Sequence, residues 1–336
     1  MSASESPKTM NTLQAVNLAL DDALASDPNV ILLGEDVGDR QAGGVVGATK
    51  GLSSKYGDAR VRSTPIAEQA IMGAAIGAAI VGMRPVAEIM LMNFTTVAMD
   101  MIVNHAAKLR FMSGGQTHVP LTIRTMTGAG FGNGGQHSDY LEAWFAHTAG
   151  IKVVAPSTPA DAYGLLLSCI EDDDPCLFIE NLPGYWTPGP APMRGQRIPL
   201  GKANVVRAGR DVTVVSYART LNTCVAVADR LAKDGVDVEV IDLRTIAPFD
   251  EATILESVAR TGRAVIVHEA VKSFGVGAEI AARINEHLHE QLKSPVTRIG
   301  APLCPVPFSK ALENAYIPSE SAIEEAIRSR MSRKSR

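Results

Sequence analysis

The feature that most constrains the fold is a regular alternation of short apolar runs with stretches of helical spacing. VILLGEDV (30–37) and RPVAEIML (84–91) predict buried strands, whereas residues 12–25 and 159–171 have the spacing of helices. Two more helices are expected, one that opens at Pro65 and runs to about Val81 and one over 95–111. Alternation of this kind requires crossover helices between parallel strands. The sequence therefore predicts α/β architecture with parallel sheets, whose functional residues lie at the carboxyl ends of strands.

A break in this pattern divides the chain. Residues 182–200 carry five prolines and three glycines, which sustain neither a helix nor a strand ladder. The alternation of strands and helices then resumes, and a chain of 336 residues is long enough to form two domains, each with its own hydrophobic core. We predict a disordered tail over 1–10, one α/β domain over 11–182, a Pro/Gly-rich linker over 183–204 and a second α/β domain over 205–336.

Composition excludes several kinds of partner. The formal net charge is −4, whereas a protein that binds nucleic acid normally carries a basic excess. The longest uncharged apolar stretch, 70–83, is shorter than the roughly 20 residues that span a bilayer. The cysteines form no CxxC pair and suit neither a disulfide framework nor a zinc site. We expect no nucleic acid, no membrane, and a reducing, cytoplasmic location.

Three local patterns are misleading. Residues 130–135 fit GxGxxG after a strand, but the next strand ends in Pro-Ser and lacks the carboxylate of a dinucleotide fold. A glycine-rich loop that allows close backbone approach is favoured instead. His287 and His289 are two residues apart and face different sides of a helix. His137, Ser138 and Asp139 are sequence neighbours, whereas a triad is assembled in space.

Three residues could carry chemistry. Glu68 falls in the first turn of an expected helix, where it either caps that helix or shares a proton with a ligand nitrogen. Phe94 follows the strand over 84–91 and is either a core residue or a stacking surface for a flat ligand. His137 lies in a polar, glycine-rich loop, where a catalytic and a surface role compete evenly. The residues alone leave these alternatives open.

Longer collinear stretches are more specific than any single motif. They include LLGEDVG (32–38), TPIAEQAI (64–71), RPVAEIMLMNF (84–94), GGQHSDYLEAWFAH (134–147), EVIDLRTIAPFD (239–250) and PVPFSKALENAYIPS (305–319). With them, the chain from about residue 11 to 327 resembles the beta subunits of the thiamine diphosphate-dependent component of 2-oxo acid dehydrogenase complexes. The pyruvate, branched-chain and acetoin types share this layout. The resemblance implies a pyrimidine-binding domain followed by a transketolase C-terminal-like domain.

The resemblance also implies site residues. Glu68 matches the glutamate that hydrogen-bonds N1′ of the aminopyrimidine and so promotes removal of the proton from thiazolium C2. Phe94 matches the aromatic residue that stacks on the pyrimidine, and Ile66 an apolar contact near it. His137 matches the histidine that orients substrate or intermediate and serves reductive acylation.

A structural monovalent cation, K⁺, is implied as well. The matching positions contribute mostly backbone oxygens, which suit a hard cation; they are Leu121, Cys169, Ile170, Asp172 and Asp174. The acidic run 171–174 is otherwise a turn that ends a helix. The two interpretations are compatible.

Half of the implied active site is missing from this chain. The family's diphosphate and Mg²⁺ motif begins with Gly-Asp-Gly, and no such tripeptide occurs in the sequence. The resemblance places that half on an alpha subunit, in an assembly of two alpha and two beta chains that serves a lipoyl acyltransferase core. We therefore expect little tight cofactor binding by the isolated chain.

The resemblance implies oxidative decarboxylation of a 2-oxo acid, with transfer of the acyl group to a lipoyl arm. A split transketolase-like, acyloin-forming or acetoin-cleaving enzyme without a lipoyl acceptor is the alternative. A non-catalytic scaffold is a third hypothesis, against which the retention of Glu68, Phe94 and His137 argues. Departures in loops, among them Asp139 where many members have Gln, leave the substrate open.

Overall fold

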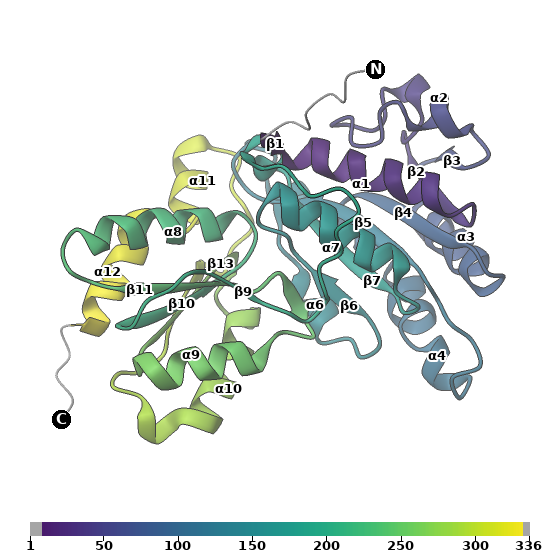
Figure 1. Ribbon diagram of the computed structural model, residues 1–336. Helices are drawn as coiled ribbons and strands as arrows, with labels where there is room; N and C mark the ends of the chain where they lie inside the picture. Colours follow the sequence, from purple (N-terminus) through teal and green to yellow (C-terminus); the bar gives the residue numbers. More distant parts are fainter. Residues whose placement is uncertain (1–8, 332–336) are drawn as a thin grey trace, which may run out of the picture. The chain divides into compact units, whose positions relative to one another are not determined.

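The computed structural model describes residues 9–331 (Figure 1). The chain divides into two compact units. Among the described residues, unit 1 comprises 9–126 and 148–200, and unit 2 comprises 127–147 and 201–331. The predicted domain limits differ from this division at one segment, because they place 127–147 in the first domain whereas it clusters with unit 2. The limits themselves stay a prediction.

Unit 1 is built on a largely parallel sheet. Its strands are β2 (Val30–Glu35), β3 (Val61–Thr64), β4 (Arg84–Leu91), β5 (Thr122–Thr127), β6 (Lys152–Val154) and β7 (Cys176–Asn181). They follow the order β6-β7-β5-β4-β2-β3. The pairs β2–β3, β2–β4, β4–β5 and β6–β7 are parallel. Crossover helices connect these strands, as the alternation predicts.

Helices α1 (Thr12–Ser26) and α7 (Pro159–Glu171) share an apolar core with one face of this sheet. Both helices begin at a residue whose side chain caps the helix N-terminus. For α1, Asn11 and Gln14 form a reciprocal capping box, and for α7 the Thr158 side chain accepts from the backbone N–H of Asp161. The predicted helix over 159–171 and strand over 84–91 are confirmed. Helix α3 (Glu68–Ile80) packs against β4.

The sequence-based expectations are wrong at three places in unit 1. The helix predicted to open at Pro65 begins at Glu68, because the first helical hydrogen bond is accepted by Ala67. The helix predicted over 95–111 is broken into η2 (Met92–Thr96), a π-helical turn η3 (Met101–Ala106) and α4 (Leu109–Met112).

The third difference concerns the predicted tail over 1–10. Thr9 and Met10 belong to β1 (Thr9–Asn11), which pairs antiparallel with β8 (Pro188–Pro190) inside the predicted linker. Residues 1–8 lie outside the described part of the chain. The remaining elements of unit 1 are η1 (Asp39–Gln41), α2 (Leu52–Tyr56) and η4 (Pro183–Trp186).

Unit 2 contains a second sheet in the order β14-β13-β10-β11-β9. Its strands are β9 (Asn204–Arg207), β10 (Val212–Ser216), β11 (Val238–Asp242), β13 (Ala264–Val271) and β14 (Thr297–Ala301). Strand β10 pairs in parallel with β11 and β13, and β13 pairs in parallel with β14, whereas the edge strand β9 is antiparallel to β11. The predicted α/β class with parallel sheets is therefore confirmed, apart from this antiparallel edge.

Helices cover both faces of the second sheet (Figure 1). Helices α8 (Arg219–Ala232) and α12 (Glu320–Met331) lie on one side, and α9 (Glu251–Thr261) and α10 (Val276–Leu288) on the other. Shorter elements fill the connections: α5 (Gly135–Ser138), α6 (Glu142–Ala146), β12 (Thr245–Ala247), η5 (His289–Gln291) and α11 (Lys310–Tyr316). Among residues 9–331, no helix combines the length and apolar character needed to cross a bilayer.

Candidate functional site

Carboxyl ends of neighbouring parallel strands define the candidate site of unit 1. Strand β2 pairs in parallel with β3, so that Glu35 lies opposite Thr64 at the end of both strands, and β4 runs parallel on the other side of β2. Residues that follow parallel strands emerge at one edge of the sheet. Ile66 and Glu68 follow β3, and Phe94 follows β4. The three residues predicted to bind a pyrimidine ring therefore emerge at the same edge.

Glu68 is the first residue of α3, at a helix end that favours negative charge. Its side chain is half-buried. The neighbouring Glu35 is affected by it: burial, and then the charges of Asp36 and Glu68, raise the pKa of Glu35. The Glu68 carboxyl therefore lies within electrostatic reach of a second carboxyl, that of Glu35.

The ring of Phe94 is half-buried against an apolar cluster that includes Leu91, Met126 and Tyr185. The side chain of Ile66 is 74% exposed. Packing fixes one side of the Phe94 ring and leaves part of it accessible, so the core role and the stacking role proposed for this residue are compatible.

A buried ionic group lies in the same sheet and was missed by sequence reasoning. Arg124 donates to Glu88 at 2.6 Å and to Glu180 at 2.6 and 2.8 Å, and Tyr185 hydrogen-bonds to Glu180. Burial alone would lower the pKa of Arg124, but the carboxylates of Glu180 and Glu88 outweigh it and raise the pKa. The group ties β4, β5 and β7 together next to the cluster that holds Phe94.

His137 belongs to unit 2. It lies in α5, directly after a run of glycines, and its side chain is half-buried. Gly130, Gly132 and Gly134 have φ values of +136°, +70° and +74°, conformations that only glycine adopts readily. Helix α5 has only four residues, and the Asp139 carbonyl that follows it accepts from the Thr127 hydroxyl at 2.8 Å.

Two buried titratable side chains flank Tyr217 in unit 2. The Tyr217 hydroxyl donates to Glu142 Oε1 at 2.6 Å, and the Tyr217 ring stacks on His268 at a centroid distance of 6.2 Å. Burial raises the pKa of Glu142 to about 7 and lowers the pKa of His268 to about 4. Glu142 Oε2 and His268 Nε2 have no hydrogen-bond partner among the described residues. Both side chains are therefore favoured in their neutral forms.

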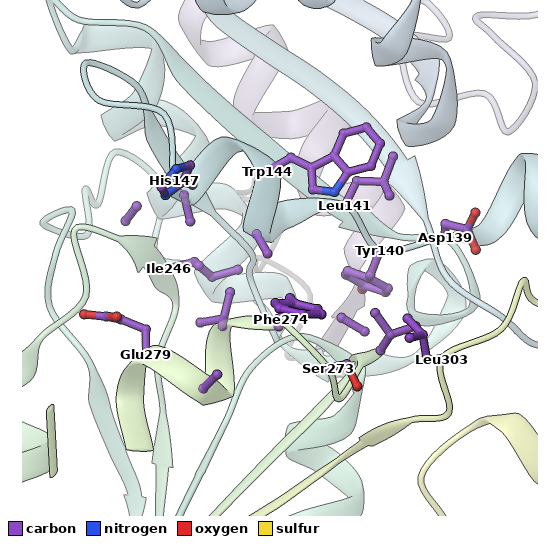
Figure 2. Close-up of a pocket in the computed structure, with 18 of the residues that line it drawn as sticks. Asp139, Tyr140, Leu141, Trp144, His147, Ile246, Ser273, Phe274, Glu279 and Leu303 are labelled. Carbon is purple, nitrogen blue, oxygen red and sulfur yellow. The ribbon is translucent and has the colours of Figure 1, made fainter. Parts of the chain in front are cut away.

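A cavity of about 1430 Å³ opens in unit 2 beside α5 and α6. Figure 2 shows Trp144 and Leu141 on one wall and Phe274 facing them. Its lining is mainly apolar, with Asp139, His147, Ser273 and Glu279 as polar groups. Asp139 follows α5 directly, so the cavity borders the segment that carries His137.

The residues predicted to bind a monovalent cation gather around the end of α7. The carbonyl oxygens of Ile170 and Asp172 accept from Arg84 at 3.2 and 3.1 Å, and the carboxylates of Asp172 and Asp174 pair with Lys152. Each carbonyl keeps a second lone pair. Among residues 9–331, no group of three or more His, Cys, Asp or Glu side chains is arranged to hold a metal ion. The K⁺ site stays a prediction.

The structure thus brings Ile66, Glu68 and Phe94 to one edge of unit 1 and places His137 in unit 2. Sequence reasoning missed the buried charges. A usable signal exists for Arg124, which stands in a strand, LTIRT, that is otherwise uncharged and reads as buried. A charged side chain in such a strand requires a partner.

Two family models match the chain. "Transketolase, pyrimidine binding domain" covers residues 8–184, and "Transketolase, C-terminal domain" covers residues 201–323. Both matches agree in order with the two α/β domains predicted from the sequence.

Curated relatives align along nearly the whole chain. The beta subunit of an acetoin:2,6-dichlorophenolindophenol oxidoreductase from Cupriavidus necator is 45% identical, over 94% of this chain and 96% of the relative. The beta subunit of the pyruvate dehydrogenase E1 component from Bacillus subtilis is 42% identical, over 95% and 98%. The 2-oxoisovalerate dehydrogenase subunit beta of the same organism is 39% identical, over 95% and 98%.

A solved structure described as a split gene transketolase, inactive beta4 tetramer, has a TM-score of 0.77 and 21% identity. The match covers 97% of this chain and 99% of that one. At this identity the likeness supports the fold alone.

Proposed function

We propose a function on the premise that the chain belongs to the family of beta subunits of pyruvate, branched-chain 2-oxo acid and acetoin dehydrogenases. With an alpha subunit it forms the decarboxylating component of a 2-oxo acid dehydrogenase. This enzyme releases carbon dioxide from a 2-oxo acid and passes the acyl group to a lipoyl group on an acyltransferase core. The observation that carries the proposal is the emergence of Ile66, Glu68 and Phe94 at one edge of the sheet.

That edge fits the aminopyrimidine half of thiamine diphosphate. Phe94 offers a half-buried ring for stacking, Ile66 an exposed apolar side chain, and Glu68 a carboxyl at a helix end. When bound, thiamine diphosphate supplies the electron sink for loss of carbon dioxide.

Glu68 holds the proton that is shared with N1′ of the aminopyrimidine. A shared proton must pass in both directions, so the carboxyl cannot be fixed in one protonation state. The first turn of α3 places the Glu68 carboxyl at a helix end, and its charge helps to raise the pKa of the neighbouring Glu35.

His137 orients the substrate and donates a hydrogen bond while the acyl group moves to the lipoyl acceptor. The loop that carries it belongs to unit 2, so this role depends on residues 127–147 being held in place. His137 and Glu68 come from different units and have separate tasks: Glu68 serves the cofactor, and His137 serves the substrate.

The alpha subunit completes the site. It binds the diphosphate and Mg²⁺, for which this sequence has no Gly-Asp-Gly motif. The assembly contains two alpha and two beta chains. All four cysteines are free thiols in the structure, and the cytoplasmic location is proposed on the cysteine content.

K⁺ binds at the end of α7, through Leu121, Cys169, Ile170, Asp172 and Asp174, and stabilises the turn into β7. A ligand that binds only the folded chain raises its thermal stability. The melting temperature should be higher in potassium chloride than in choline chloride of equal ionic strength. Equal melting temperatures in the two salts would remove the cation from the proposal.

A second candidate function is acetoin cleavage, which the 45% identity to an acetoin oxidoreductase beta subunit favours. In that case the substrate is an acyloin. The two-carbon unit then passes to an acceptor, with or without a lipoyl group. The two functions share Glu68, Phe94 and His137 and differ in substrate.

The decisive experiment is co-purification with the alpha subunit, followed by a dye-linked assay. Pyruvate, branched-chain 2-oxo acids, 2-oxoglutarate and acetoin are compared, each with and without a lipoylated acceptor. Turnover of a 2-oxo acid with lipoyl acylation supports the main proposal. Turnover of acetoin alone favours the second candidate, and no turnover of any of them contradicts both.

A further inference from the structure

A buried carboxylate from α11 holds the backbone of the loop that carries His137. Glu313 has no exposed side-chain surface. Its Oε1 accepts from the N–H groups of Gly130 at 2.5 Å and Gly132 at 3.1 Å, and its Oε2 accepts from Gly132 at 3.2 Å. One side chain therefore fixes two alternate peptide groups of the loop.

Other side chains of unit 2 complete the attachment. Glu269 Oε1 accepts from the N–H of Ala129 at 2.6 Å, and Arg219 donates to the Ala129 carbonyl at 3.2 Å. Lys310, at the start of α11, donates to the Gly130 carbonyl at 2.9 Å. These bonds hold the loop at residues 129–132, upstream of α5.

The segment before α11 packs closely against the glycines that follow. A Cβ atom on Gly134 would lie 2.3 Å from Phe308 Cζ, and one on Gly135 would lie 2.9 Å from Pro305 Cβ. Residues 305–313 therefore contact the loop at its glycines from Gly130 to Gly135. No side chain longer than hydrogen fits between Phe308 and Gly134.

Such anchoring matters because a glycine-rich segment has many accessible conformations. A carboxylate that accepts several N–H bonds is among the stronger ways to select one of them. We propose that Glu313 is a positioning residue for His137: through Gly130 and Gly132 it fixes the loop in the conformation that presents the imidazole to the reacting group. The inference rests on the proposed function for its catalytic consequence.

The first test measures the loop itself in the full-length chain. Glu313→Ala removes both acceptors, and Glu313→Gln keeps one amide oxygen. Lys310→Met leaves both Glu313 acceptors in place and removes the bond to the Gly130 carbonyl together with the 3.8 Å ion pair between Lys310 and Glu313. Glu325→Gln, on the exposed side of α12, is the control for loss of one negative charge. Hydrogen exchange is followed in peptides that cover 127–138, with strands β10 and β11 as internal references.

Exchange at 127–138 should rise about tenfold in Glu313→Ala, since a local opening that loses charge-assisted bonds is easier. It should rise less in Glu313→Gln and Lys310→Met, and stay at the wild-type rate in Glu325→Gln. Wild-type exchange in Glu313→Ala, or an equal rise in β10 and β11, would overturn the proposal. Lys310→Met and Glu313→Gln keep the test informative if Glu313→Ala does not fold.

The second test asks whether the loop positions His137. Reaction of His137 with diethyl pyrocarbonate is followed by peptide mass spectrometry, and its rate should change at least about threefold in Glu313→Ala and return toward wild type in Glu313→Gln. This readout needs no turnover, so it decides the inference even if the proposed function fails. An unchanged rate in Glu313→Ala overturns it.

The third test uses the reconstituted enzyme with its alpha subunit. Glu313→Ala should lower kcat about tenfold while the thiamine diphosphate concentration for half-maximal activity stays within about twofold, because the loop acts on the substrate side. In a His137→Ala background the same change should add no further loss, since both act through one imidazole. Losses that add in the double variant would contradict a positioning role.

Discussion

The hydroxyl of Tyr217 donates a 2.6 Å hydrogen bond to the carboxyl of Glu142, which is fully buried. On its other side the Tyr217 ring stacks on His268, which is also fully buried. One tyrosine thus links a carboxyl with a pKa near 7 to an imidazole with a pKa near 4. Lowering the pH protonates both groups, which favours the folded state at Glu142 and disfavours it at His268.

Their effects on stability should cancel over part of the pH range. The folded pKa of Glu142 is raised from 4.5, so its contribution is fully present below pH 4.5 and is lost as the pH rises through 7. The folded pKa of His268 is lowered from 6.5, so its contribution is present above pH 6.5 and is lost as the pH falls through 4. Between its two pKa values, each group changes the free energy of unfolding by about 1.4 kcal/mol per pH unit.

We therefore expect Glu142→Gln to make the free energy of unfolding rise by about 1.4 kcal/mol per unit between pH 4.5 and 6.5, relative to wild type. His268→Asn should make it fall by a similar slope. Urea unfolding in a Trp186→Phe background, where Trp144 reports unit 2 alone, measures both. Parallel profiles for wild type and the two variants would show that neither group titrates as described.

The ionic group of unit 1 predicts a large loss of stability. Arg124→Met leaves Glu88 and Glu180 buried without their cation, which should cost about 3–5 kcal/mol. Arg40→Met, which breaks an exposed pair with Asp58 in the same unit, should cost about 0–1 kcal/mol. Urea unfolding in a Trp144→Phe background reports unit 1 through Trp186. Similar costs for the two arginines would refute the argument from burial.

Gly134 should not tolerate a side chain. Its φ of +74° and ψ of 179° lie in a region that is essentially restricted to glycine, and Phe308 leaves no room. Gly134→Ala should cost about 1–3 kcal/mol from the backbone alone, and more from the collision. Adding Phe308→Ala should recover the second part and leave the first. Full recovery in the double variant would mean that the backbone carries no strain.

Glu68→Gln should abolish turnover in the reconstituted tetramer without preventing its assembly, because an amide cannot exchange the proton with the aminopyrimidine. Size-exclusion chromatography measures assembly, and the dye-linked assay measures turnover. Glu325→Gln serves as the control of equal charge. Turnover at the wild-type rate in Glu68→Gln would favour a scaffold over an enzyme.

Cofactor affinity should depend on the partner. The isolated chain contributes Ile66, Glu68 and Phe94 but lacks the Gly-Asp-Gly motif, so calorimetry with thiamine diphosphate and Mg²⁺ should detect little binding. The complex with the alpha subunit should bind tightly. Micromolar affinity of the beta chain alone would locate a diphosphate site in this chain and contradict the divided site.

Local signals explain which elements were predictable. Helix α7 has a Thr158 cap, Pro159 at its first position and an acidic turn at its end, and its limits are those expected from the sequence. The predicted helix over 95–111 fails because Thr95 and Thr96 bond back to carbonyls three residues earlier, at 2.6 and 2.7 Å, and a π-helical turn follows. Helix α11 has seven residues, too few for a periodic pattern.

Residues of the candidate site were predictable only where they directly follow a strand that the sequence pattern reveals. Glu68 and Phe94 follow strands that the apolar runs reveal. Glu313 meets Gly130 across 183 residues of sequence, and nothing in either neighbourhood points to the other. Pairings of this kind follow from the three-dimensional fold and not from local pattern.

That separation has a consequence during synthesis. At roughly 5–20 residues per second, the ribosome needs about 10–35 s after Gly130 emerges before Glu313 follows. Throughout that interval the glycine-rich segment lacks the carboxylate of Glu313, whereas unit 1, which ends at Leu200, can already fold. The nascent chain must therefore remain soluble with this loop unanchored, and the loop becomes ordered only when translation is nearly complete.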